Sequence, residues 1–215
     1  MTDVQHTEQH PVVEVIAAGR IVPVVVLEEA ADAGRLADAL VAGGLGCAEV
    51  TFRTAAAADA IRAMAERPGM LVGAGTVLTA AQVDQAVDAG ARFVVSPGFS
   101  AAVVARCQEH GVPVFPGVAS PSEIMQALDA GLSTVKFFPA EQLGGVPMLK
   151  ALSAPFRSVR FIPTGGVNTG NLAEYLAVRS VLAVGGTWMV APELLAARDW
   201  DAVTSRTKSA LEKIA

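Results

Sequence analysis

The chain has 215 residues, of which 52% are hydrophobic and 17% are charged, and its formal net charge is −5. The low charged fraction excludes disorder for most of the chain, and the acidic balance excludes a general binder of nucleic acids or other polyanions. Mean hydropathy is +0.45, yet no apolar run approaches the roughly 20 residues that cross a membrane.

The first residues are polar and end at Pro11, which predicts a flexible leader over residues 1–11 and a single domain over residues 12–215. This leader lacks the basic and apolar regions of a secretion signal. Its two histidines, His6 and His10, do not make a convincing metal site. Cys47 and Cys107 stand far apart without a CxxC spacing, which favours two buried free thiols. A cytoplasmic protein with no metal and no cofactor is expected.

Beyond the leader, short apolar runs alternate with alanine-rich segments. Successive runs lie about 20–26 residues apart, the length of one strand, one helix and two turns. The runs are almost continuously apolar, as in parallel strands covered on both faces, and the segments between them have helical periodicity. We predict strands near Val24, Val50, Val72, Val94, Val114, Val135, Phe161 and Leu182, and helices including Asp32–Ala42, Ala55–Glu66, Ala80–Ala89 and Ser122–Ala130.

Eight strand–helix units predict an α/β fold, a single-domain (β/α)8 TIM barrel. An open, doubly wound sheet uses the same units and is the alternative. The absence of a GxGxxG turn after the first strand favours the closed barrel. Reactive side chains in a barrel project from the carboxyl ends of the strands, so polar residues in or after the apolar runs are the candidates for function.

Lys136 lies within the strand-like run Thr134–Pro139. Burial of an ammonium group is costly, so a lysine in this position favours its neutral, nucleophilic amine form. Such an amine can form a Schiff base with a carbonyl substrate. A structural lysine that reaches the strand end or pairs with a carboxylate is the alternative.

Glu49, Thr51 and Arg53 are every second residue of another strand, so their side chains share one face, which is expected to lie inside the barrel. Glu49 is a candidate general acid and base, and Arg53 is a candidate clamp for a substrate carboxylate. A buried structural ion pair would explain the same residues.

Glycine-rich turns follow several runs. Thr76 stands beside two glycines that let a ligand approach the backbone, although a helix N-cap would also explain this threonine. The segment Ser96–Gly98 is read first as a turn. Gly-Gly pairs follow the last two runs, at 165–166 and 185–186, where barrels often bind phosphate through backbone N–H groups.

Together, these segments resemble the bacterial family of 2-keto-3-deoxy-6-phosphogluconate aldolases, which are class I pyruvate aldolases. The matching stretches run from Ile21 to Trp188, and the combination of EVTFRT with KFFPAE is quite specific. They are GCAEVTFRT, VGAGTVL, VVSPGFS, VPVFPGVASPSE, VKFFPAE, FIPTGGV and VGGTW.

The resemblance implies that Lys136 is the Schiff-base lysine and Glu49 the general acid and base. It implies carboxylate binding by Arg53 and Thr76, and a pocket lined by Pro97, Phe138 and Thr164. It places the phosphate at Gly165, Gly166, Gly185, Gly186 and Thr187, the last of which is often serine in the family.

The implied reaction cleaves a phosphorylated keto-sugar acid into pyruvate and glyceraldehyde 3-phosphate, and the family also tends to cleave 4-hydroxy-2-oxoglutarate. A homotrimer is implied by resemblance. The alternatives are an aldolase for the galactonate epimer, a phosphate-binding isomerase or epimerase, and a non-catalytic sugar-phosphate-binding module. Val25–Leu27 replaces the arginine-glycine common in the galactonate enzymes, which favours the gluconate substrate.

Overall fold

A computed structural model describes residues 10–214 of the chain. Strands and helices alternate along these residues, as the apolar runs predict. The strands are β1 (Ile21–Val25), β2 (Cys47–Thr51), β3 (Leu71–Gly75), β4 (Val94–Val95), β5 (Val114–Phe115), β6 (Gly117–Val118), β7 (Thr134–Phe137), β8 (Arg160–Pro163) and β9 (Val184–Gly186). The helices are α1 (Pro11–Gly19), α2 (Ala33–Ala42), α3 (Ala57–Ala65), α4 (Ala80–Asp88), α5 (Ala101–Glu109), α6 (Pro121–Asp129), α7 (Gly145–Ser153), α8 (Leu172–Leu176), α9 (Pro192–Ala197) and α10 (Trp200–Glu212).

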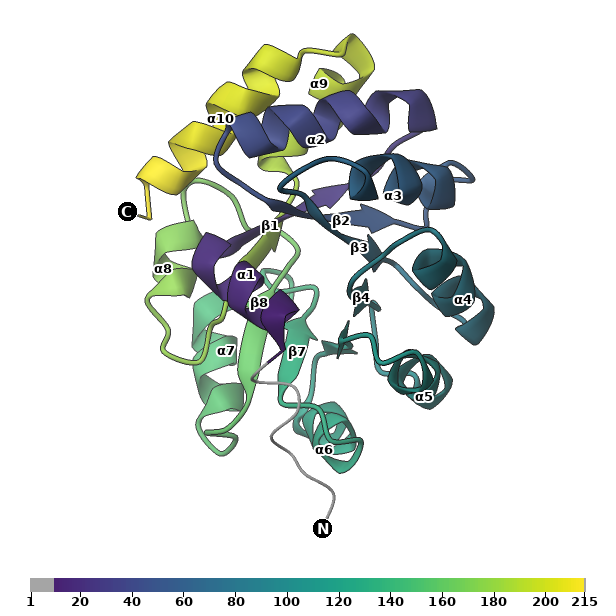
Figure 1. Ribbon diagram of the computed structural model, residues 1–215. Helices are drawn as coiled ribbons and strands as arrows, with labels where there is room; N and C mark the ends of the chain where they lie inside the picture. The colour runs from purple at the N-terminus through teal and green to yellow at the C-terminus, as the bar shows by residue number, and fades with distance from the viewer. Residues whose placement is uncertain (1–9, 215) are drawn as a thin grey trace.

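The strands curl into a parallel arrangement with the helices outside it (Figure 1). A six-stranded section has the order β5-β4-β3-β2-β1-β9, and a three-stranded section has the order β6-β7-β8. Two single bridges, Phe161 to Val181 and Thr164 to Gly185, link β8 to the β9 side. On the other side, the N–H of Gly117 donates to the carbonyl of Ser96 at 2.9 Å. The predicted single-domain α/β fold is therefore confirmed, but its hydrogen-bonded ladder is interrupted rather than continuous.

Two apolar clusters fill the two sides of this curled sheet. The larger one lies between the strands and the surrounding helices and includes Val50, Ala74 and Val135. The smaller one lies inside the ring and contains Phe93 and Phe115, whose ring centroids are 5.9 Å apart. Side chains of alternating parity on the same strands supply the two clusters, as expected for parallel strands buried on both faces.

Helix α1 covers the amino-terminal end of the strands, and the sequence analysis did not predict this helix. It lies across the ring in Figure 1, and Val12, Val13 and Ile16 join the interior cluster. The His10 Nδ1 atom accepts a hydrogen bond from the N–H of Val12 at 3.2 Å, and Pro11 occupies the first turn. The last two residues of the predicted leader thus start a helix, while residues 1–9, including His6, lie outside the described part of the chain.

Two strands differ from their predicted positions. One strand was predicted near Val114, whereas the structure has two, β5 and β6. Pro116 lies between them and has no N–H to donate to a neighbouring strand. The last strand covers residues 184–186, after the expected centre at Leu182, because its ladder partners are Ile21, Val22 and Pro23 of β1.

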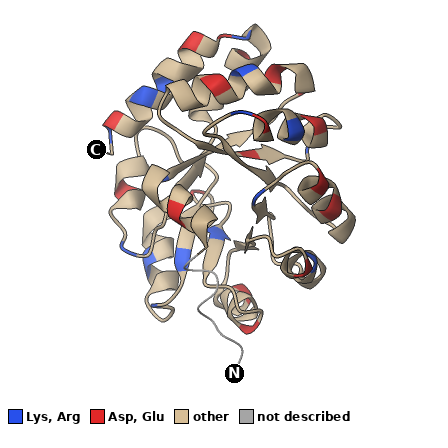
Figure 2. Cartoon of the chain, viewed as in Figure 1, with Lys and Arg blue, Asp and Glu red and all other residues tan. Residues whose placement is uncertain are grey.

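Most charged residues lie on the outer helices, whereas the strands are mostly uncharged (Figure 2). None of the helices within residues 10–214 is long and apolar enough to cross a membrane.

Candidate active site

Lys136 and Glu49 meet inside the ring of strands. Lys136 is on β7, between Gly117 and Ile162, and Glu49 is on β2, opposite Gly73 of β3. Lys136 Nζ donates a hydrogen bond to Glu49 Oε1 at 3.4 Å, and the two side chains are only 6% and 4% exposed. The alternation of side chains along each strand places both residues inward. This direction was predicted for Glu49, and burial within a strand was predicted for Lys136. A potential nucleophile and a carboxylate therefore share one water-poor site.

The surroundings of this pair are largely apolar. Phe138, the residue after β7, places its ring centroid 5.1 Å from Lys136 Nζ. A small enclosed cavity borders both charged side chains and Thr164, and the rest of its lining consists of Ile16, Val22, Phe93, Val95, Phe115 and Ile162. Since Ile16 belongs to α1, this helix forms an apolar floor beneath the pair.

Gly75, at the end of β3, makes room for the Glu49 side chain. A Cβ atom at Gly75 would lie 2.1 Å from Glu49 Oε1 and 2.4 Å from Glu49 Cγ. The sequence analysis assigned the glycines near Thr76 to the approach of a ligand. The structure shows that the group lying against Gly75 is the candidate catalytic carboxylate itself.

Arg53 and Thr76 lie together beyond the ends of β2 and β3. Arg53 Nε donates a hydrogen bond to Thr76 Oγ1 at 3.4 Å. Thr76 has a φ of 55°, which is a left-handed conformation that residues other than glycine seldom adopt. The N-cap of α4 is Thr79, whose side chain accepts from the N–H of Gln82, so the alternative role of Thr76 as this cap is wrong. Strain of this kind is common at functional sites.

The remaining predicted pocket residues also follow strand ends. The carbonyl oxygen of Pro97 would lie 2.0 Å from a Cβ at Gly117, so the turn after β4 packs directly on the start of β6. Ser96 Oγ donates to the carbonyl of Gly98 at 2.8 Å, as expected for a turn. Thr164 is 6% exposed and packs against Gly185.

The two Gly-Gly pairs differ in conformation. Gly165 and Gly166 have φ values of 97° and 81° and form a turn after β8. Gly185 and Gly186 belong to β9 and pair with β1, so the predicted second glycine turn is wrong at these two residues. A Cβ at Gly186 would lie 1.7 Å from Trp188 Cζ3, so the neighbouring indole leaves no room for a side chain at this position. Thr187, directly after this strand, is exposed.

The cysteines are far from a reactive state. Cys47 and Cys107 are free and buried, and burial raises the pKa of each thiol to about 12. Groups of three or more potential metal ligands are absent from the part of the chain between residues 10 and 214.

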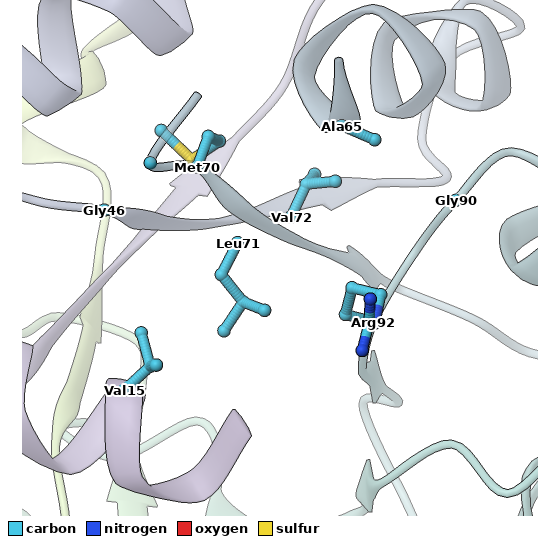
Figure 3. Close-up of a pocket in the computed structure, with 9 residues that line it drawn as sticks. Val15, Gly46, Ala65, Met70, Leu71, Val72, Gly90 and Arg92 are labelled. Carbon is cyan, nitrogen blue, oxygen red and sulfur yellow. The ribbon is translucent and has the colours of Figure 1, made fainter. Parts of the chain in front are cut away.

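A wider pocket of about 370 Å³ lies at the opposite end of the strands, beside α1. Figure 3 shows Val15 and Leu71 on one side of it and Arg92 on another. Arg92 is the one charged residue in its lining, and no candidate nucleophile or general base reaches it. Reaction chemistry is therefore favoured at the Lys136–Glu49 site and not at this pocket.

Comparison with known proteins agrees with the resemblance seen in the motifs. The sequence model of the KDPG and KHG aldolase family matches residues 12–206. The chain is 54% identical to the 2-dehydro-3-deoxy-phosphogluconate aldolase of Treponema pallidum, over 93% of this chain and 95% of that protein.

Two solved structures of aldolases are similar in fold and sequence. One is the 2-keto-3-deoxy-6-phosphogluconate aldolase of Zymomonas mobilis with 3-phosphoglycerate, at a TM-score of 0.88 and 44% identity, covering 93% of this chain and 94% of that one. The other is the KDPG aldolase of Legionella pneumophila with pyruvate captured as a covalent carbinolamine intermediate. Its TM-score is 0.90 at 43% identity, covering 94% of this chain and 98% of that one.

Proposed function

Because the chain belongs to the KDPG and KHG aldolase family, we propose that it is a class I aldolase that cleaves 2-keto-3-deoxy-6-phosphogluconate. The products are pyruvate and glyceraldehyde 3-phosphate. The observation that carries this proposal is the buried Lys136 amine, 3.4 Å from the Glu49 carboxylate. Relatives and solved structures with this activity in their names cover more than nine-tenths of the chain, which supports the same assignment.

In this proposal, Lys136 Nζ attacks the C2 ketone of the substrate and water leaves, giving an iminium ion that can accept an electron pair. Glu49 accepts the proton of the C4 hydroxyl, the C3–C4 bond breaks, and its electrons form an enamine with the iminium carbon. The aldehyde product leaves. Glu49 then returns the proton to C3, and hydrolysis of the imine releases pyruvate and the free amine. The pair can thus supply both functions of the cycle, nucleophile and proton carrier.

Two further groups bind the ends of the substrate. Arg53 and Thr76 bind the C1 carboxylate, since a guanidinium group and a hydroxyl are both donors to such an anion. Pro97, Phe138 and Thr164 line the pocket between the two ends. The phosphate binds at the turn of Gly165 and Gly166, at β9 residues Gly185 and Gly186, and at Thr187, through backbone N–H groups and one hydroxyl.

Reductive trapping tests the central step. Wild-type protein treated with pyruvate and borohydride should gain one pyruvate-derived adduct in its intact mass, located at Lys136 by peptide mapping. Lys136→Met should lose the adduct, whereas Lys150→Met, at an exposed lysine of α7, should retain it. An isomerase or epimerase that uses Lys136 only as a charge would form no adduct, and neither would a sugar-phosphate-binding module. An adduct that persists in Lys136→Met would show that another lysine is the nucleophile.

The same site also fits 4-hydroxy-2-oxoglutarate, because that substrate has the pyruvate half and lacks the phosphate. The name of the matching family includes this second activity. Comparison of kcat/KM on this compound, on the gluconate substrate and on its galactonate epimer ranks the three reactions.

The resemblance also supports a homotrimer, which sedimentation of the purified protein would test. A cytoplasmic location stays a prediction.

A further inference from the structure

A hydrogen-bonded pair, Tyr175 and Glu141, lies behind the glycine turn after β8. Tyr175 is on α8 and is fully buried in the outer apolar cluster. Its hydroxyl donates a hydrogen bond to Oε1 of Glu141, which is in the segment between β7 and α7. Neither residue contacts Lys136 or Glu49 in the hydrogen bonds described, so the proposed imine chemistry leaves this pair without a role.

The Glu141 side chain packs directly on the turn. A Cβ atom at Gly166 would lie 2.5 Å from Glu141 Cγ and 2.6 Å from Glu141 Cβ. The backbone of the same segment is hydrogen-bonded to the turn, with the N–H of Glu141 donating to the carbonyl of Gly165 at 3.0 Å. Glu141 therefore holds the turn at its backbone and at its side chain.

The carboxylate of Glu141 would be harmful if it were free to move. A negative charge that swings over the N–H groups of the turn would repel a bound phosphate and compete for the same donors. The Tyr175 hydroxyl engages one of its oxygens on the side of the apolar cluster. Burial and the hydrogen bond to Glu141 raise the pKa of Tyr175, so its hydroxyl remains a donor at neutral pH.

We propose that Tyr175, acting through Glu141, is a positioning residue that shapes the Gly165–Gly166 turn and thereby sets the preference for phosphorylated over unphosphorylated substrates. This inference rests on the proposed function, because it assigns the phosphate to that turn. It assigns to the pair an effect on the distal end of the substrate and none on Schiff-base formation.

Tyr175→Phe tests the proposal, since it removes the hydroxyl and leaves the ring in the core. KM for 2-keto-3-deoxy-6-phosphogluconate should rise and kcat/KM should fall about tenfold, which is the factor that one hydrogen bond to a charged group commonly supplies. The value of kcat/KM on 4-hydroxy-2-oxoglutarate, and the rate of borohydride trapping with pyruvate, should stay within about twofold of wild type.

Three further variants separate positioning from general packing. Glu141→Ala, at an exposed residue, removes both the acceptor of the Tyr175 hydrogen bond and the Cγ that packs on Gly166. Loss of this support should also lower the preference for the phosphorylated substrate, and the two changes combined should cost no more than Glu141→Ala alone. Glu141→Gln retains an oxygen that accepts the hydrogen bond from the Tyr175 hydroxyl, so it should preserve the preference for the phosphorylated substrate. Glu174→Gln removes a neighbouring charge on α8 and should leave both substrates unaffected.

Equal loss on both substrates, or no loss on either, in both Tyr175→Phe and Glu141→Ala would overturn the positioning role. Absence of the pyruvate adduct from wild-type protein would instead overturn the proposed function, so the two failures are distinguishable.

Discussion

Substitution of Gly75 by alanine should damage catalysis by displacing Glu49, although neither reactive residue is itself replaced. The new Cβ would lie 2.1 Å from Glu49 Oε1, whereas ordinary contact begins at 3.4 Å. The carboxylate must therefore move by about 1 Å or more, away from its position 3.4 Å from Lys136 Nζ. A displacement of about 1 Å in a catalytic group can cost roughly 10²-fold in rate, or about 2.7 kcal/mol of transition-state stabilisation.

Two assays report this displacement separately. Steady-state cleavage should show kcat lowered by roughly 10²-fold, and the methyl protons of pyruvate should exchange more slowly in deuterated water. Borohydride trapping should still label Lys136, because the amine is intact. Gly98→Ala is the matched control, since a Cβ at Gly98 meets no atom within 4 Å.

A double-mutant cycle establishes whether the effect passes through Glu49. In a Glu49→Ala background the side chain that the new Cβ would strike is missing, so Gly75→Ala should have almost no further effect on kcat. Wild-type kcat and proton exchange in Gly75→Ala would refute the reasoning, as would an equal additional loss in the Glu49→Ala background.

Three other changes follow from the same structure. Glu49→Gln should lower kcat by roughly 10²–10⁴-fold, because it keeps the shape and removes the base; unchanged exchange of the pyruvate methyl protons would exclude Glu49 from that step. Thr187→Val should reduce kcat/KM for the phosphorylated substrate more than for 4-hydroxy-2-oxoglutarate, and equal losses would place the phosphate elsewhere. Hydrogen bonds from Arg106 and His110 hold the pKa of Asp84 below its ordinary value, so its stabilising effect is present at neutral pH and is lost as the pH falls through that lowered pKa. Thermal melts of Asp84→Asn and wild type should therefore differ at pH 7 and converge in strong acid.

The strand register explains why so much of the site was predictable. Side chains alternate with a period of two, so the inward directions of Glu49 and Lys136 follow from their places in two apolar runs. The order of parallel strand–helix units then brings both residues to the same interior. Local sequence rules were sufficient for this part of the site.

The unpredicted features depend on the packing of particular side chains, which glycine-rich motifs do not reveal. The need for glycine at position 75 arises from packing of the Glu49 side chain of β2 against β3, which no local pattern encodes. Gly186 was predicted to be part of a turn, whereas the structure shows that the indole of Trp188 requires a glycine there. Substitution of Gly186 by valine would therefore test packing against Trp188 as well as phosphate binding.

Helix α1, which forms the apolar floor of the site, has a consequence for the order in which the chain folds. Helix α1 has nine residues, which is too short for stable helix formation in isolation. Its inward residue Ile16 packs in the interior cluster with Phe115, Ile162 and Leu182, which lie far later in the chain. Part of the packing of α1 is therefore completed only by segments that are synthesised much later, although β1 and β2, which follow it directly, also contact it. Until those segments emerge, the interior beside Ile16 is incomplete, and its closure by α1 belongs to a late stage of folding.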